Sequence, residues 1–218
     1  MNTRIIVQAV AAIVVAVFAI GIWLTGGTLE VTWLRFYAAA VLAALGAIAL
    51  WEWFIWRLPL VQKIPIVPRN INGTWKGTLT SFWKDPATGE SPSPKTVYLV
   101  IRQNSATISV AMLSEESRST SSLARLTTSA ALTSLDYMYL NRPDNRFEHK
   151  SRMHHGSASL DVSGKPAIRL CGRYWTDRDS RGELDFTERH RHPADDFKEA
   201  KSLFSRKNRA TPRPARNG

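Results

Sequence analysis

Aromatic rings and guanidinium groups recur in the later two thirds of the chain, and together they have the chemistry needed to bind a nucleotide. Tyrosine and tryptophan rings stack on bases, and arginines form paired hydrogen bonds with phosphates. The stacking candidates are Tyr98, Tyr137, Tyr139, Tyr174 and Trp175, and the phosphate-binding candidates are Arg102, Arg173, Arg178 and Arg181. The alternative is that the aromatic residues form a domain core and that the arginines are solvated at strand edges.

Sequence motifs of familiar enzyme chemistry do not occur in the chain. His154-His155 and the histidines at positions 149, 190 and 192 lack the HExxH, CxxC or carboxylate spacings of metal sites. A GxSxG nucleophile elbow and a Walker-type phosphate loop are also missing from the sequence. We therefore expect a binding protein that is not an enzyme, with no metal and no cofactor. A single cysteine, Cys171, excludes an internal disulfide and allows a reducing compartment.

The elements that carry these groups are predicted to be strands of one small domain, residues 70–192. Short runs of β-branched and aromatic residues alternate there with turn residues. The runs typical of strands cover residues 73–83, 96–103, 106–113, 119–127, 131–141, 152–162, 167–177 and 182–191. About eight consecutive strands favour an antiparallel barrel, with a sandwich as the alternative. A barrel of this size has room for one small ligand.

Alternation along the strands indicates which side chains share a face. In the first strand, Trp75 lies on one face and Thr74 and Lys76 lie on the other, which is polar and expected to be solvated. In the seventh strand, Tyr174 and Trp175 lie on opposite faces. Large aromatic residues on both faces leave the inward face of that strand undecided.

Two apolar runs within residues 1–57 precede the β domain. Residues 5–24 carry no charge, and residues 36–56 carry only Glu52. At about 1.5 Å per residue, each run covers roughly 30 Å, the thickness of a bilayer hydrocarbon core. Both are predicted to be transmembrane helices, because the first run is longer than the apolar region of a cleaved signal peptide. Basic residues flank the outer ends of the pair, which predicts that both termini and the barrel are cytoplasmic.

Small residues recur in the second apolar run, where Ala39, Ala43 and Ala47 are spaced four apart. A face of small residues lets helices approach closely in lipid. This face serves either to pack the two helices as a hairpin or to assemble several chains.

The remaining segments are a linker and a basic C-terminus. Residues 58–69 are rich in proline and are expected to be an extended spacer. Residues 193–205 are expected to form a short helix, with acidic residues in its first turn and lysines later. Residues 206–218 are basic and expected to be disordered. The net charge of +11 is concentrated at this end, since residues 69–197 carry 18 basic and 15 acidic residues.

Several short segments follow the apolar pair in a recognisable order. They are Gly73-Thr-Trp-Lys-Gly77, residues 137–143, His155-Gly156 before a strand, and residues 172–182. In this order they resemble the two-transmembrane β-barrel effectors of bacterial cyclic-oligonucleotide antiphage signalling (CBASS), which are associated with CD-NTase enzymes. The likeness covers nearly the whole chain to about residue 191.

The resemblance implies an antiphage function. The barrel would bind a cyclic dinucleotide made by a partner CD-NTase nucleotidyltransferase, the chain would form a homo-oligomer, and its helices would disrupt the lipids of the inner membrane. Carried onto this sequence, Tyr174 is the stacking residue, Thr176 shares its face, and Arg178 binds phosphate. The site residues implied are Tyr137, Tyr139, Asn141, Arg173, Tyr174, Thr176 and Arg178. Asn141 shares a face with the first two tyrosines and can read a base edge.

Two other functions fit parts of the sequence. The segment around Trp75 also resembles the opening of lipocalin-type barrels, so the domain could be a membrane-anchored barrel that binds a lipid or another apolar molecule. In that comparison Trp75 closes one barrel end and is structural. The chain could also be an anchored adaptor whose basic tail meets anionic lipid or nucleic acid. Because residues 69–197 are nearly neutral, we expect no binding of DNA or RNA by the barrel.

Overall fold

The computed structural model describes residues 3–26, 32–86, 88–129, 132–149 and 151–210. The chain divides into two compact units. The first comprises residues 1–68 with residues 104–106, and the second comprises residues 69–103 with residues 107–218. The second unit contains the predicted β domain and the C-terminal helix.

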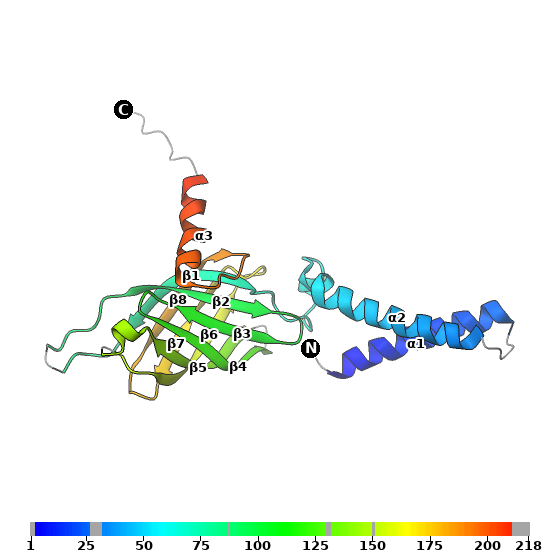
Figure 1. Cartoon of the computed structure of the whole chain (residues 1–218), viewed down its shortest axis with the longest axis horizontal. Coiled ribbons are helices and arrows are strands. Elements are labelled where there is room, and N and C mark those ends of the chain that lie inside the picture. Colours follow the sequence, from blue (N-terminus) through cyan, green and yellow to red (C-terminus); the bar gives the residue numbers. More distant parts are fainter. Residues whose placement is uncertain (1–2, 27–31, 87, 130–131, 150, 211–218) are drawn as a thin grey trace, which may run out of the picture. The chain divides into compact units, whose positions relative to one another are not determined.

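Eight strands in the second unit form a closed antiparallel barrel. Each strand pairs with the next along the chain, and β8 pairs with β1 to close the ring (Figure 1). The strands are β1 Gly73–Ser81, β2 Lys95–Gln103, β3 Ile108–Leu113, β4 Ser117–Ser129, β5 Leu132–Pro143, β6 His154–Ser163, β7 Arg169–Thr176 and β8 Arg181–His190. The prediction of an antiparallel barrel is therefore confirmed, and the sandwich is excluded.

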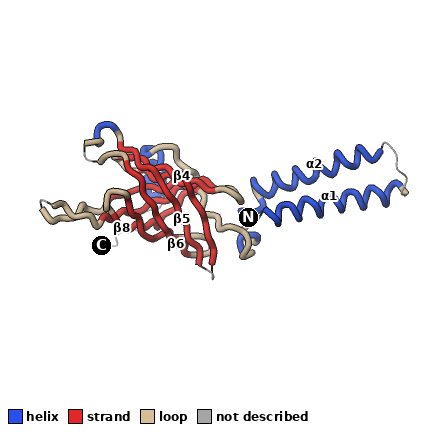
Figure 2. The backbone as a smooth tube through the Cα atoms, turned by 90° about the horizontal axis from the view of Figure 1, so that it is seen from below, coloured by secondary structure: helices blue, strands red, loops and turns tan. Residues whose placement is uncertain are grey.

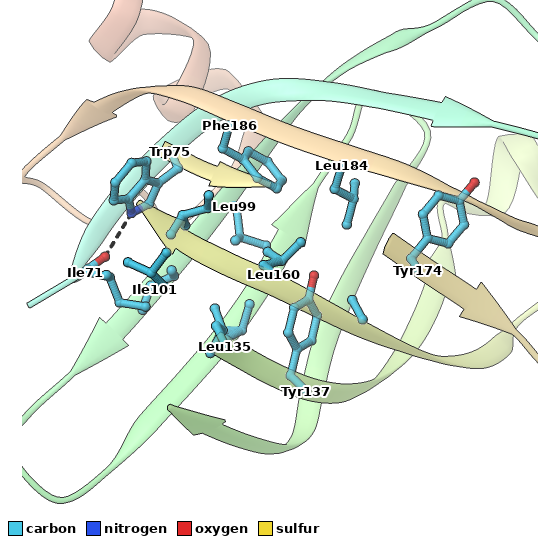
Figure 3. Close-up of a cluster of buried hydrophobic side chains, with 14 of the residues drawn as sticks. Ile71, Trp75, Leu99, Ile101, Leu135, Tyr137, Leu160, Tyr174, Leu184 and Phe186 are labelled. Carbon is cyan, nitrogen blue, oxygen red and sulfur yellow. Dashed lines mark hydrogen bonds between the residues drawn. The ribbon is translucent and has the colours of Figure 1, made fainter. Parts of the chain in front are cut away.

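One end of the barrel is closed by Trp75, which is fully buried. Its indole N–H donates a hydrogen bond to the Ile71 carbonyl oxygen at 2.8 Å (Figure 3). The Arg189 guanidinium lies 5.2 Å from the centre of the Trp75 rings. Burial lowers the pKa of Arg189 to about 10. The same guanidinium donates to the carbonyl oxygens of Asn70 and Asn72. Trp75 thus has the structural role expected of it.

The barrel interior next to Trp75 is filled by side chains from alternate positions along the strands. Leu99, Leu135, Leu160 and Leu184 are almost completely buried there (Figure 3). Burying side chains of this size provides about 1.5–3 kcal/mol each relative to exposure. The aliphatic core is therefore the main source of the barrel's stability, and it limits how far a ligand can enter.

The C-terminal helix, α3 (Phe197–Ala210), packs on the outer face of β1 and β2 (Figure 1). The segment before α3 covers Thr74, whose hydroxyl donates to the His192 carbonyl oxygen at 2.7 Å and accepts from the Ala194 N–H at 2.8 Å. The expectation of a solvated polar face on the first strand is wrong at Thr74, which is fully buried. Its hydrogen bonds to the segment before α3 satisfy the buried hydroxyl.

The bounds of α3 also differ from the prediction. The Asp196 carboxylate accepts a hydrogen bond from the Glu199 N–H at 2.7 Å, so Asp196 caps the helix and the segment before it is not helical. At the other end, residues 206–210 are helical and not disordered. The prediction of disorder rested on the basic, proline-bearing composition after Phe204, but arginine and lysine are good helix formers. Residues 211–218 of the predicted tail lie outside the described residues.

The first unit contains two helices, α1 (Thr3–Thr25) and α2 (Thr32–Trp53), that run side by side (Figure 2). Among the described residues, one helical stretch, Ala38–Arg57, is long and apolar enough to cross a membrane. The corresponding stretch of the first helix, Val10–Leu24, is shorter. The transmembrane hairpin therefore stays a prediction.

The predicted spacer is not fully extended. It contains a short 3₁₀ helix, η2 (Val61–Lys63), after a similar turn, η1 (Ile55–Arg57). The Gln62 side-chain amide donates to the Trp56 carbonyl oxygen at 2.6 Å and to the Pro68 carbonyl oxygen at 3.1 Å. These hydrogen bonds join the two ends of the segment, which is why it folds back despite its prolines.

Candidate ligand-binding site

Strand β5 directs three of the predicted site residues into the barrel. Tyr137, Tyr139 and Asn141 are each buried, whereas Met138 between the tyrosines is 53% exposed. The three residues lie in successive rows toward the barrel end opposite Trp75. This end is bordered by the loop that joins β5 to β6 and by the turn that joins β7 to β8.

Strand β7 contributes Tyr174 and Thr176 to the same end. Tyr174 is buried, and Trp175 is 51% exposed. The face containing Gly172, Tyr174 and Thr176 is therefore the inward face, which alternation alone left undecided. Tyr174 lies opposite Gly182 on β8, and a Cβ at position 182 would be 2.7 Å from a Tyr174 ring carbon. Glycine at this position gives the ring its space.

The two β5 tyrosines are neutral phenols in an apolar environment. Burial raises the pKa of Tyr137 and of Tyr139 well above the ordinary value of 10.0. Their ring centres are 5.8 Å apart. Figure 3 shows the Tyr137 side chain directed into the barrel. Within the described part of the chain, the buried Tyr137 hydroxyl has no hydrogen-bond partner. Such a group is exceptional in a protein interior and is ready to donate to a ligand.

Asn141 and Ser119 form a polar pair nearer the barrel end. The Ser119 hydroxyl donates to the Asn141 side-chain oxygen at 2.8 Å. This bond occupies the amide oxygen of Asn141, so the amide NH₂ group is the donor available to a ligand. Sequence reasoning missed Ser119, because its pairing with Asn141 follows from the register of β4 and β5.

Arg178 lies at the rim, in the turn after β7. The Arg178 guanidinium is exposed and donates to the Ser151 hydroxyl at 3.1 Å, and the backbone N–H of Arg178 donates to the Thr176 hydroxyl at 3.3 Å. His154 is close enough that Arg178 contributes to lowering its pKa, although burial is the larger cause. Ser151 and His154 are further residues of this rim that the sequence did not identify.

Arg173 is not brought together with the other candidates. It lies on the outer face of β7, opposite Ser159 and Glu183 in the register, and it is exposed. Tyr98 and Arg102, two further candidates for nucleotide binding, also lie away from this barrel end. Tyr98 lies on the outer face of β2 under α3, and Arg102 forms an ion pair with Asp195 at 2.5 Å.

The barrel end combines neutral aromatic rings, amide and hydroxyl donors, and the Arg178 guanidinium at the rim. Among the residues that the structure describes, no group of three or more histidine, cysteine, aspartate or glutamate side chains is arranged to hold a metal ion. The arrangement can stack on bases, donate hydrogen bonds to base edges and pair with a phosphate.

Comparisons with known proteins agree with this chemistry. Residues 65–188 match the family model described as Cap15, cyclic dinucleotide receptor domain. The chain is also similar to the CD-NTase-associated protein 15 of Staphylococcus schleiferi, with 29% identity over 135 residues. This alignment covers 62% of the chain and 66% of that relative, slightly less than two thirds of its length. Both comparisons agree with the CBASS effector family that the sequence resembles.

Proposed function

The chain belongs to the family of Cap15 cyclic dinucleotide receptor domains, and from this premise we propose that a cyclic dinucleotide binds at the barrel end opposite Trp75. The ligand is made by a CD-NTase enzyme. Its bases stack on Tyr139 and Tyr174, and the Asn141 amide donates to a base edge. Arg178 pairs with a phosphate at the rim. Arg173 has no part in this site.

The observation that carries the assignment is the buried Tyr137 hydroxyl. A hydroxyl left without a partner in the interior costs about 1–3 kcal/mol. A base inserted between Tyr139 and Tyr174 reaches Tyr137, because Tyr137 and Tyr139 are neighbouring inward-facing residues on β5. A carbonyl oxygen or ring nitrogen of the base then accepts the hydrogen bond and removes this cost.

The depth of the site follows from the packing below it. Leu135, Leu160 and Leu184 fill the next row of the barrel. A base therefore enters only as far as Tyr137, and the charged phosphates stay at the solvated rim beside Arg178. The same packing disfavours the lipocalin-like alternative, since an acyl chain needs a deep apolar cavity.

We further propose that ligand binding drives oligomerisation and that the oligomer disrupts the inner membrane. Support comes from the apolar surface of the first unit, where Leu42, Leu50 and Trp53 of α2 are 69%, 61% and 80% exposed. Side chains of this kind are stable in a lipid bilayer and unfavourable in water. Ala39 and Ala43 are exposed as well, so small residues are available for close approach by helices of other chains.

The test is calorimetric titration of the 218-residue chain in detergent micelles. Cyclic di-GMP, cyclic di-AMP and mixed cyclic dinucleotides form one set of ligands, and a long-chain fatty acid is the comparison. We expect at least one cyclic dinucleotide to bind with a Kd below about 100 µM. Binding of the fatty acid alone would contradict the receptor function. For the membrane step, the ligand should release dye from vesicles that contain the chain, and an oligomer without leakage would indicate an adaptor.

A further inference from the structure

A cavity lies outside the barrel, between α3 and the outer surface of β1, β2 and the turn from β3 to β4. Its volume is about 540 Å³, which falls in the range of roughly 300–1,000 Å³ that is usual for small-molecule sites. Tyr98 and Thr96 of β2 line it from the barrel, and Phe197, Lys201 and Phe204 line it from α3. Because Thr96 and Tyr98 lie on the outer face of β2, the cavity is separate from the residues that face the interior.

Aromatic rings form the floor of the cavity. Tyr98 stacks on Phe204 with ring centres 5.7 Å apart and an interplanar angle of 29°. Phe197 meets Tyr98 edge to face, with ring centres 5.5 Å apart. Tyr98 and Phe204 are buried, and burial raises the pKa of the Tyr98 hydroxyl, which stays neutral. A planar base can extend such an aromatic cluster by stacking.

Three ammonium groups line the cavity. Lys76 is paired with Glu188 at 2.8 Å, and Lys95 is paired with Glu116 at 2.6 Å. An ammonium group has three donors, so each pair leaves hydrogen-bonding capacity and holds the lysine in place. Lys201 is exposed on α3 and forms no ion pair with a described residue. A phosphate bound here would be attracted mainly by Lys201.

An acidic side chain completes the lining at the turn between β3 and β4. Glu115 lines the cavity, and its side chain forms no hydrogen bond or ion pair with a described residue. The Glu115 carboxylate can accept hydrogen bonds from a ribose hydroxyl or from the N–H groups of a base.

We propose that this cavity is a second binding site and that it takes a nucleotide. The base stacks on the half-buried ring of Phe197, which packs against Tyr98 at the edge of the aromatic cluster, a phosphate contacts Lys201, and Glu115 accepts from the ribose or the base. The nucleotide is either a cellular mononucleotide or the cyclic dinucleotide itself, since both present the same base and phosphate. Because α3 provides one wall, bound nucleotide stabilises the helix in its place on the barrel. The cavity thereby couples nucleotide binding to the position of the C-terminal helix.

The experiment measures nucleotide binding to the 218-residue chain in detergent micelles by calorimetry. The probes are AMP, GMP, inorganic phosphate and cyclic di-GMP. Lys201→Glu reverses the charge at the cavity, and Thr96→Trp fills the cavity from an exposed position on β2. Lys198→Glu is the matched control, because it makes the same charge change at an exposed position of α3 that does not line the cavity.

We expect AMP or GMP to bind and each cavity variant to weaken that binding by about tenfold or more. Lys198→Glu should leave the affinity nearly unchanged, and Arg178→Ala at the barrel rim should not affect mononucleotide binding. Hydrogen exchange in residues 197–205 should slow when the nucleotide is bound.

Three outcomes would overturn the second site. These are no binding of any nucleotide probe, an affinity in both cavity variants equal to that of the parent chain, and a loss of affinity in the Lys198→Glu control as large as in Lys201→Glu. If cyclic di-GMP binding is lost in the cavity variants and kept in Arg178→Ala, the cavity is supported and the rim assignment fails. If it is lost only in Arg178→Ala while AMP and GMP still depend on Lys201, both sites stand.

Discussion

Tyr139 on β5 lies directly opposite Gly156 on β6, and its ring occupies the space where a side chain at position 156 would begin. A Cβ at that position would be 2.5 Å from both the ring carbon Cζ and the hydroxyl oxygen of Tyr139. A Cβ atom does not approach a non-bonded atom this closely in proteins, so any side chain at position 156 must displace the ring. The pair fixes where one wall of the proposed site lies.

Gly156→Ala should therefore destabilise the barrel by about 1–3 kcal/mol, the usual cost of overpacking. It should also weaken binding of the cyclic dinucleotide, because the Tyr139 ring no longer lies against β6. Urea unfolding and calorimetry measure the two effects. Ser157→Ala, at the half-buried neighbouring position, is the control and should change stability by less than about 0.5 kcal/mol. Wild-type stability in Gly156→Ala would contradict the role given to this glycine.

Tyr137→Phe should change stability and binding in opposite directions. Removing the buried hydroxyl, which has no partner among the described residues, should keep or raise the free energy of unfolding, by up to about 1 kcal/mol. The affinity for the cyclic dinucleotide should fall by about fivefold to tenfold, because a hydrogen bond to the base is lost. Unchanged affinity would show that the ligand does not reach Tyr137.

Arg178→Ala and Arg173→Ala form a matched pair of charge deletions. Both arginines are exposed, but Arg178 lies at the rim of the proposed site and Arg173 lies on the outer face of β7. Loss of the phosphate contact should lower the affinity by about tenfold to a hundredfold in Arg178→Ala. Arg173→Ala should bind as the parent chain does. The reverse result would place the ligand outside the barrel.

His154 should make the barrel less stable in mild acid. Burial, the largest cause, and the nearby Arg178 lower its pKa below the ordinary value of 6.5, although Asp177 opposes the shift. Between pH 6.5 and the lowered pKa, the unfolded chain binds a proton at this position more readily than the folded chain does. The stability that neutral His154 allows is fully present above pH 6.5, and it is lost as the pH falls through the lowered pKa of the folded chain.

The measurement is urea unfolding from pH 7.5 to pH 5 in the parent chain and in His154→Gln. Other groups titrate in both proteins, so the difference between the two curves isolates His154. His149→Gln, in the exposed loop before β6, is the control. The parent should lose more stability on acidification than His154→Gln does, and parallel curves would rule out a role for His154.

The C-terminal helix offers a separate test of the fold. Asp196→Ala removes the carboxylate that accepts the Glu199 N–H and should cost about 1 kcal/mol. Hydrogen exchange of α3 reports the loss. The expected effect is an increase in α3 exchange while the β5 and β6 amides keep their protection. Uniform loss of protection would mean that α3 and the barrel unfold together.

Much of the barrel follows from sequence patterns that act locally. Turn residues between runs of β-branched and aromatic residues predicted all eight strands in order, because strand propensity and turn chemistry depend on a few neighbouring residues. Alternation also placed Tyr137, Tyr139 and Asn141 on one face. Local patterns could not decide β7, since Tyr174 and Trp175 are adjacent and both aromatic.

The remaining features of the site depend on contacts between segments that are distant in the sequence. Closure of the ring and its register place Tyr139 against Gly156 and Asn141 beside Ser119. The segment before α3 buries Thr74, although its polar side chain is of a type expected to be solvated. The strands, the apolar helices and the chemical types of the site residues follow from local sequence patterns. The fold determined which of them face inward, because side-chain alternation is symmetric until packing against distant residues buries one face.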